Sequence, residues 1–295
     1  MNFKETLNKK VEQIESVIRE FLPKEEDYQK TIMEAMNYSV MAGGKRLRPM
    51  LIQESYELFG GSGTVVKPFM AAMEMIHTYS LVHDDLPAMD NDDYRRGRKT
   101  THVVYGEAMG ILAGDALLNY AFETALKAFD EEPQNPAIPE ALKILAGKAG
   151  IYGMIGGQVV DVQAEGQTVE KERLDFIYRL KTGALIEASM MIGSLLAGAT
   201  KEQVGCMERV AADVGLAFQI QDDILDVTST IEVLGKPINS DEKNNKTTYV
   251  TLEGLDKAKA DVARISERAL NTLALQENRN EFLEELVKYL IYREK

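Results

Sequence analysis

Two clusters of aspartates carry the densest chemistry in this chain. The first places five aspartates within ten residues, and three arginines follow directly. Carboxylates this close repel one another unless a cation lies among them, and their oxygens suit Mg²⁺, which shares its coordination with water and substrate phosphates. Arginine pairs with phosphate oxygens two at a time. The cluster therefore predicts a site for a diphosphate carried on magnesium, and it consists of Asp84, Asp85, Asp90, Asp92, Asp93, Arg95, Arg96 and Arg98.

The second cluster holds Asp222, Asp223 and Asp226 within an apolar segment. Asp222 and Asp226 are four residues apart, so both project from one face of a helix. A single cluster of this kind is equally compatible with a solvated helix face. Two clusters, each at the end of an apolar helical run, favour two opposed sets of carboxylates with metal ions between them. We call Asp84, Asp85 and Asp90 the first acidic motif, and Asp222, Asp223 and Asp226 the second acidic motif.

A basic segment precedes both motifs and runs Gly43-Gly44-Lys45-Arg46-Leu47-Arg48-Pro49. Glycine allows positive φ or close approach to a ligand, and the free N–H groups at a helix start favour anions. Taken alone, the segment also fits an ordinary helix end with a basic surface loop. Beside the acidic motifs, it indicates a second phosphate site.

Other polar side chains lie on apolar helices near the motifs. His77 precedes Asp84 by seven residues, which places both on nearly the same helix face; a purely structural histidine fits equally well. Lys181 and Thr182 interrupt an apolar run, where a lysine that snorkels to solvent is the alternative. The polar segment 228–247 carries Gly235, Lys236 and Lys246 and is typical of a lysine-bearing lid beside a metal site. Gln158 and Asp161 lie one turn apart, and a structural role for them stays open.

Apolar residues at steps of three and four predict that helices position these groups. We find no convincing strand, so the expected fold is all-α with about ten or more helices in one domain, 1–295. Pro87 disfavours helix at the residue before it, so a turn after Asp84 must bring Asp90 back, and 95–101 is expected to be a mobile polar loop. Expected helices cover 7–21, 32–40, 50–59, 65–84, 111–129, 141–164, 172–198 and 201–226, with two or three more at the C-terminus; five glycines between 147 and 157 require close packing against a neighbour.

Size and charge limit the possible function classes. The chain has 295 residues, 45% hydrophobic and 27% charged, enough for one large core or two modest domains. The net charge of −13 argues against nucleic acid as a partner. Without the eight aspartates Asp84, Asp85, Asp90, Asp92, Asp93, Asp222, Asp223 and Asp226, the balance would be −5, so much of the excess acidity lies in the two clusters.

Targeting and redox signals favour the cytoplasm. No apolar run reaches the roughly 20 residues that a membrane span requires, and the first residues show no apolar signal core. A single cysteine, Cys206, excludes an internal disulfide and fits a reducing compartment. We therefore expect a cytoplasmic protein without a membrane span.

The order of these motifs along the chain resembles that of the isoprenyl diphosphate synthases, the trans-prenyltransferases, most of all the bacterial farnesyl diphosphate synthases (geranyltranstransferases). The resemblance covers almost the whole chain. A lone Asp-Asp-x-x-Asp is a weak signal, but the ordered set is specific. It comprises Gly43 to Pro49, the Asp-Asp-x4-Asp of the first acidic motif, Arg95-Arg96-Gly97, Lys181-Thr182-Gly183, Phe218-Gln219 and the Asp-Asp-x-x-Asp of the second acidic motif.

The resemblance implies a single all-α trans-prenyltransferase domain of the isoprenoid synthase type, built around a central cavity and assembled as a homodimer. It implies three Mg²⁺ ions held by Asp84, Asp90 and Asp222, with Asp85, Asp223 and Asp226 in support. Catalysis would involve the residues Asp84, Asp85, Asp90, Arg95, Lys181, Asp222 and Asp223. The allylic diphosphate would be bound by Arg95, Lys181, Thr182, Gln219, Lys236 and Lys246, and isopentenyl diphosphate by Lys45, Arg48, His77 and Arg96.

The implied reaction is ionisation, condensation and elimination, in which isopentenyl diphosphate attacks an allylic cation formed from dimethylallyl or geranyl diphosphate. Tyr79 precedes Asp84 by five residues, about 7.5 Å along a helix, and with Ser80 it resembles the pattern that stops the product at C15, farnesyl diphosphate. Tyr79 as plain core is the alternative. A C20 (geranylgeranyl) synthase, a terpene cyclase and a non-catalytic partner subunit are the rival functions. A cyclase would not need the second diphosphate site, and a non-catalytic subunit typically lacks the acids.

Overall fold

Helices make up nearly all of the regular structure in the computed structural model, which describes residues 2–228 and 247–291. This confirms the all-α fold expected from the spacing of apolar residues. Contacts between residues divide the chain into two compact units: unit 1 is Met1–Gln53 with Ser62–Leu142, and unit 2 is Glu54–Gly61 with Lys143–Lys295. The single domain expected over 1–295 stays a prediction. None of the described helices is long and apolar enough to cross a membrane.

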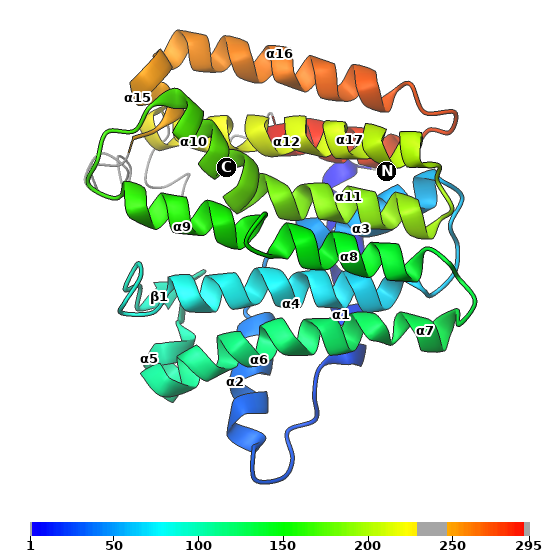
Figure 1. The fold of residues 1–295 in the computed structure, drawn as a ribbon, viewed down its shortest axis with the longest axis vertical. Helices are drawn as coiled ribbons and strands as arrows, with labels where there is room; N and C mark the ends of the chain where they lie inside the picture. Colours follow the sequence, from blue (N-terminus) through cyan, green and yellow to red (C-terminus); the bar gives the residue numbers. More distant parts are fainter. Residues whose placement is uncertain (1, 229–246, 292–295) are drawn as a thin grey trace. The chain divides into compact units, whose positions relative to one another are not determined.

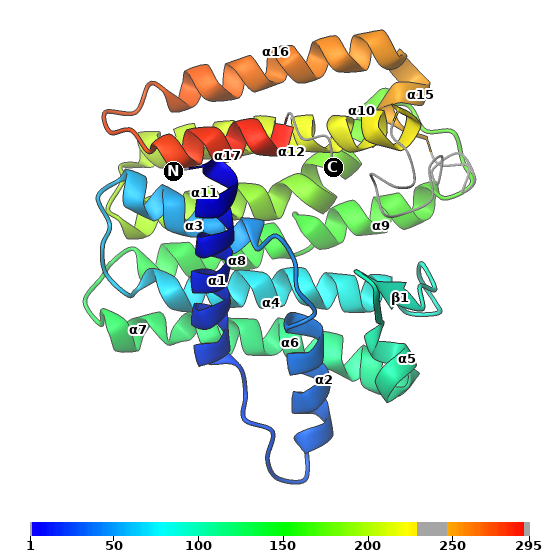
Figure 2. The same ribbon diagram turned by 180° about the vertical axis from the view of Figure 1, so that it is seen from behind.

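Unit 1 is built on the helix that ends in the first acidic motif, α4 (Val66–Asp84), which is buried along most of its length. It packs beside α6 (Glu107–Leu126), as Figures 1 and 2 both show. Glycine on α6 permits this approach, because a Cβ at Gly114 would collide with the ring of His83. The other elements of unit 1 are α1 (Phe3–Phe21), α2 (Lys30–Val40), β1 (Tyr94–Arg95), β2 (Arg98–Lys99), α5 (Thr101–Tyr105) and α7 (Ala128–Glu131), while α3 (Leu47–Leu58) and α8 (Ile138–Ala149) continue into unit 2.

The basic segment between α2 and α3 is fastened by Arg46, which is 2% exposed. Its guanidinium donates to the Glu74 carboxylate on α4 at 2.6 Å and to the Val40 carbonyl at 2.9 Å. It also reaches Glu15 on α1 at 3.1 Å. These bonds hold together α1, α2 and α4, and they hold Arg46 itself at a φ of 49°. Arg46 is thus a structural member of the basic segment.

The chain reverses after α4 as the proline predicts. α4 ends at Asp84, and the Asp90 amide donates to the Asp84 carbonyl at 2.8 Å, which brings Asp90 back. The expected mobile loop at 95–101 is wrong, and so is the expected lack of strands. β1 and β2 pair antiparallel around Arg96 and Gly97, both with positive φ. Such a turn suits a two-residue hairpin, and two-residue strands are too short to show an alternating pattern.

Unit 2 is built on α12 (Lys201–Thr228), the helix that carries the second acidic motif. In Figures 1 and 2 it lies between α11 and α16, and both contact it. The remaining elements of unit 2 are α9 (Met154–Ala164), α10 (Lys171–Ile177), the π-helical segment η1 (Tyr178–Gly183), α11 (Ala184–Leu196), α15 (Tyr249–Glu253), α16 (Leu255–Leu273) and α17 (Glu281–Ile291).

Two expected helices of unit 2 are interrupted. The single helix expected over 141–164 breaks between α8 and α9, where a Cβ at Gly153 would collide with the Lys148 carbonyl. Gly157 then lies against the backbone of Lys181, which confirms the expected close packing for this glycine, whereas a Cβ at Gly147 would meet nothing within 4 Å. The helix expected over 172–198 contains the π segment η1, and π turns occur frequently at functional sites.

Replacing Arg46 with Met should destabilise the protein by about 3–5 kcal/mol, because Glu74 is left buried without its partner. Urea unfolding at pH 7 measures this free energy. The matched control is Arg19→Met, which removes an exposed arginine 3.9 Å from the same Glu15 and should cost under about 1 kcal/mol. Equal losses for the two variants would contradict the structural role of Arg46.

Candidate active site

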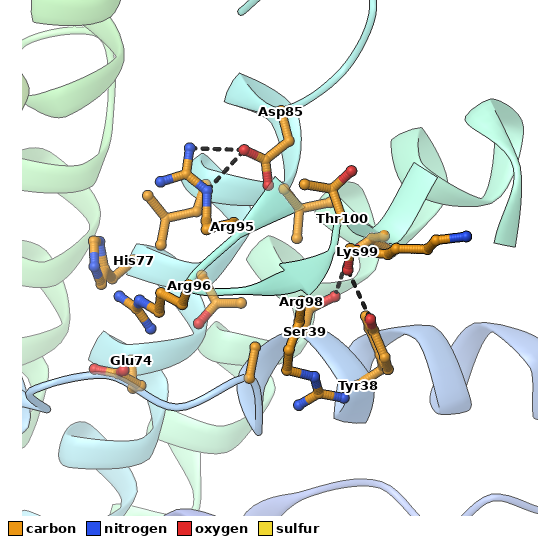
Figure 3. A pocket seen from close by; sticks show the side chains of 15 residues that line it. Tyr38, Ser39, Glu74, His77, Asp85, Arg95, Arg96, Arg98, Lys99 and Thr100 are labelled. Atoms are coloured by element: carbon orange, nitrogen blue, oxygen red, sulfur yellow. Dashed lines mark hydrogen bonds and ion pairs between the residues drawn. The ribbon is translucent and has the colours of Figure 1, made fainter. Parts of the chain in front are cut away.

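A pocket in unit 1 gathers Asp85 of the first acidic motif and several cations (Figure 3). Asp85 is 4% exposed, and its Oδ1 accepts hydrogen bonds from Nε and Nη2 of Arg95, each at 2.7 Å. Burial raises the pKa of Asp85, and the bond to Arg95 opposes that rise. Burial would by itself lower the pKa of Arg95, but the bond to Asp85 raises it. The Asp85 carboxylate and the Arg95 guanidinium therefore stabilise each other as a charged pair.

Next to this pair lies a group that we call the cation cluster, Arg48, His77 and Arg96. Burial lowers the pKa of Arg48 to about 10; the charge of Glu74 opposes this, and that of Arg96 adds to it. Burial also lowers the pKa of Arg96. The pKa of His77 falls well below its usual value because of burial and then the charges of the surrounding arginines, Arg48 foremost. His77 is therefore a neutral hydrogen-bonding group at pH 7.

The cation cluster has the features of an anion site. Nε of Arg48 is buried, and within the described part of the chain it has no hydrogen-bond partner. Arg96 donates to the carbonyl of Gly43, and a Cβ at Gly44 would collide with its guanidinium. The glycines of the basic segment thus let Arg96 of the hairpin reach that segment, where Lys45 is exposed. An anion placed here would offset the burial and the mutual repulsion that lower these pKa values.

Unit 2 has a pocket of its own beside the second acidic motif, with a volume of about 230 Å³. Nζ of Lys181 lies 2.6 Å from Oδ2 of Asp161, so Asp161 belongs to this pocket, while Gln158 is not among the described residues that line it. The pocket therefore brings together most of the site residues expected in this part of the chain. Its polar lining includes Asp161, Lys181, Thr182, Gln219, Asp222 and Asp223.

Two tyrosines that sequence reasoning missed meet Asp223. The Tyr178 hydroxyl and the Tyr249 backbone N–H both donate to Oδ2 of Asp223, each at 2.6 Å. Tyr178 lies in an apolar run, and nothing in its spacing distinguishes it from a core residue. Asp226 is also buried, whereas Asp222 is only half-buried.

The expected chain-length residues lie on α4. Tyr79 is 5% exposed, and its hydroxyl has no hydrogen-bond partner among the residues that the structure describes. Burial, followed by the charge of Asp84, raises its pKa to about 12. Its ring meets the His83 ring edge-on at 5.9 Å. Ser80 donates to the carbonyl of His77 in its own helix at 2.8 Å.

The acidic motifs provide carboxylate oxygens, the donors that Mg²⁺ prefers. Within residues 2–228 and 247–291, no three His, Cys, Asp or Glu side chains converge as a ready-made metal site. Asp85 and Asp223 are instead engaged by Arg95 and by the two tyrosines. The donor chemistry fits magnesium, and the opposition of the two motifs, which belong to different units, stays a prediction. Lys236 and Lys246 lie outside the described residues.

Comparison with known proteins identifies the family. A model of the family described as polyprenyl synthetase matches residues 29–290. The chain belongs to the polyprenyl synthetase family. A farnesyl diphosphate synthase of Geobacillus stearothermophilus is 43% identical over 263 residues, which cover 89% of this chain and 88% of that protein. A geranylgeranyl diphosphate synthase of Cyanophora paradoxa is 45% identical over 249 residues, which cover 84% and 83%.

A solved structure agrees with this assignment. The geranyltransferase of Helicobacter pylori, complexed with magnesium and isoprenyl diphosphate, matches with a TM-score of 0.83 at 32% identity and covers 99% of this chain and 97% of its own. The isoprenyl synthase fold and the prenyltransferase class expected from the motifs are thereby confirmed. The family depends on magnesium. Because the relatives include both farnesyl and geranylgeranyl synthases, family membership leaves the product length open.

Proposed function

We propose that this polyprenyl synthetase makes farnesyl diphosphate by condensing isopentenyl diphosphate with dimethylallyl or geranyl diphosphate. The supporting observation is that one pocket places His77 and Arg96 of the cation cluster beside the Asp85–Arg95 pair (Figure 3). An enzyme that joins two diphosphates requires an anion site without metal ligands next to a metal-carrying one. A terpene cyclase, which binds one diphosphate, gives no reason for Arg48, His77 and Arg96 to gather here.

Each residue type has a distinct task in this reaction. Asp84, Asp90 and Asp222 would hold magnesium, with Asp85, Asp223 and Asp226 in support, and three ions are expected. Bound magnesium neutralises the charge that develops on the departing pyrophosphate. The remaining polar residues hold the substrates: Arg95, Lys181, Thr182 and Gln219 the allylic diphosphate, joined in our proposal by Lys236 and Lys246, and Lys45, Arg48, His77 and Arg96 the isopentenyl diphosphate.

The chemistry needs no strong base from the protein. Breaking the allylic C–O bond gives a carbocation and pyrophosphate, and the double bond of isopentenyl diphosphate then attacks the cation. The proton lost afterwards requires only a weak base, and the released pyrophosphate can accept it. A neutral His77 fits this scheme, because it binds an anion by donating a hydrogen bond and does not need to transfer a proton. The buried apolar side chains of α4 help to keep water from the cation.

Product analysis tests the proposed function. Purified protein incubated with Mg²⁺, isopentenyl diphosphate and geranyl diphosphate should release mainly C15 alcohol after phosphatase treatment, and EDTA should abolish this. Asp84→Asn and Asp222→Asn should lower kcat on the order of 100-fold or more. The matched control is Asp93→Asn, an exposed acid of the first cluster. The proposal would be contradicted by a lack of prenyl product, by insensitivity to EDTA, or by equal rates for Asp84→Asn and Asp93→Asn. C20 as the main product would favour the geranylgeranyl alternative.

Tyr79→Ala should lengthen the product from C15 towards C20, because it removes a buried ring one and a half turns before Asp84 and leaves room for another isoprene unit. Tyr79→Phe is the matched control. The hydroxyl has no partner in the described chain, so this variant keeps the volume and should keep C15. Chromatography of the dephosphorylated products measures both. Unchanged C15 output from Tyr79→Ala would remove Tyr79 from the chain-length role.

We also propose that the protein is a homodimer that pairs through α6. Apolar residues lie on all sides of α6, which is typical of a buried helix. Yet Ile111, Leu112 and Leu126 are 43%, 49% and 51% exposed. Light scattering should give about twice the chain mass of 32.9 kDa. Leu112→Glu should lower that mass towards the monomer, while Leu275→Glu, at an exposed site in unit 2, should not. A monomeric wild type would refute the dimer.

The cytoplasmic location stays a prediction.

A further inference from the structure

Asp223, a member of the second acidic motif, has a carboxylate that accepts two hydrogen bonds from distant parts of the chain. Its side chain is on α12 and is buried, and its Oδ2 accepts both the Tyr178 hydroxyl and the Tyr249 N–H at 2.6 Å. Such short distances are typical of charge-assisted hydrogen bonds. Two donors on one carboxylate oxygen occupy the lone pairs that a metal ion would need, so ligation through Oδ2 would cost both bonds.

The two donors belong to segments that come from different parts of the chain. Tyr178 is the first residue of η1, which brings Lys181 and Thr182 to the pocket of unit 2. Tyr249 is the first residue of α15, directly after Thr247 and Thr248, which line the same pocket. The carboxylate of Asp223 therefore joins three of the segments that line this pocket: α12, η1 and the start of α15.

The start of α15 depends on Asp223 for one of its free amides. The first N–H groups of a helix have no partner within it. Thr248 caps the Thr251 amide at 3.2 Å, and Asp223 caps the Tyr249 amide. The far end of Tyr249 is fastened as well, since its hydroxyl donates to Asp261 at 2.9 Å and accepts from Lys171 at 3.3 Å. Tyr249 is thus held at both ends: Asp223 binds its backbone amide, while Asp261 and Lys171 bind its hydroxyl.

We propose that Asp223 is a positioning residue: its Oδ2 holds η1 and the start of α15 in place around the diphosphate pocket, while the half-buried Asp222 carries the metal. The inference rests on the proposed function and deepens it by giving neighbouring acids different tasks. Asp223 acts through Lys181, Thr182, Thr247 and Thr248, which it aligns for the diphosphate.

Substitutions of the two neighbouring aspartates separate these tasks. Asp223→Asn keeps an oxygen that can accept both hydrogen bonds but removes the charge and one possible metal ligand. Asp223→Ala removes the acceptor. We expect Asp223→Ala to speed hydrogen exchange at the Tyr249 amide at least tenfold, because a charged hydrogen bond is worth about that factor. The same variant should weaken Mg²⁺-dependent binding of inorganic pyrophosphate about 10–100-fold. Asp223→Asn should keep the exchange rate and the half-saturating Mg²⁺ concentration within about threefold of wild type, below the tenfold that one charged hydrogen bond is worth.

Asp222→Asn should show the opposite pattern: half-saturating Mg²⁺ rises at least about tenfold, and exchange at Tyr249 stays at the wild-type rate. Exchange is followed by mass spectrometry and pyrophosphate binding by calorimetry. If Asp223→Ala does not fold, Tyr178→Phe removes one donor and keeps the charge; it should weaken pyrophosphate binding without changing the Mg²⁺ requirement, with the exposed Tyr152→Phe as its control.

The inference is overturned if Asp223→Asn raises the Mg²⁺ requirement as much as Asp222→Asn does, if Asp223→Ala leaves exchange at Tyr249 unchanged, or if Tyr178→Phe binds pyrophosphate as tightly as Tyr152→Phe. Failure of the proposed function is a separate result. A wild type that makes no prenyl product would refute the function, whereas the exchange rates of the Asp223 variants would still decide whether this carboxylate holds the start of α15.

Discussion

In both units of this protein, the buried carboxylates must be compensated by cations or hydrogen-bond donors. A buried carboxylate is costly unless donors or cations meet it, and both acidic motifs end apolar helical runs. The structure supplies partners from within each unit: Arg95 for Asp85, Lys181 for Asp161, and two tyrosines for Asp223. The partners of Asp85 and Asp161 are cations suited to a diphosphate. In our account, binding of a diphosphate with magnesium replaces the pairs Asp85–Arg95 and Asp161–Lys181 by pairs of these cations with the diphosphate.

The cation cluster shows the same constraint with the sign reversed. Two buried acids lie near these cations, but Arg46 already engages Glu74 at 2.6 Å and Arg95 engages Asp85 at 2.7 Å. The pKa of Arg48 is lowered to about 10, which shows that burial and repulsion outweigh the attraction of Glu74. The surplus of positive charge is local, in a chain whose net charge is −13. A bound anion would correct it, so capture of a diphosphate depends on this pocket and not on the overall field.

Features that depend on neighbouring residues in the chain could be predicted from the sequence. Apolar spacing located most helices, Pro87 predicted the reversal that returns Asp90, and the glycines of the basic segment predicted positive φ. The hairpin and the π segment were missed because two-residue strands and single π turns have no periodic signature. The break before Gly153 was missed because apolar residues continue at helical spacing on both sides of it. Tyr178 and Tyr249 were missed because they lie 45 and 26 residues from Asp223, and only folding brings them together.

The most direct test of the central claim is where a divalent ion binds. Mn²⁺ accepts the same oxygen ligands as Mg²⁺, and its anomalous scattering locates it in a crystal grown with Mn²⁺ and inorganic pyrophosphate. We expect Mn²⁺ on the carboxylates of Asp84, Asp90 and Asp222, with the pyrophosphate on Arg95 and Lys181. Manganese bound at only one acidic motif, or at neither, would contradict the account.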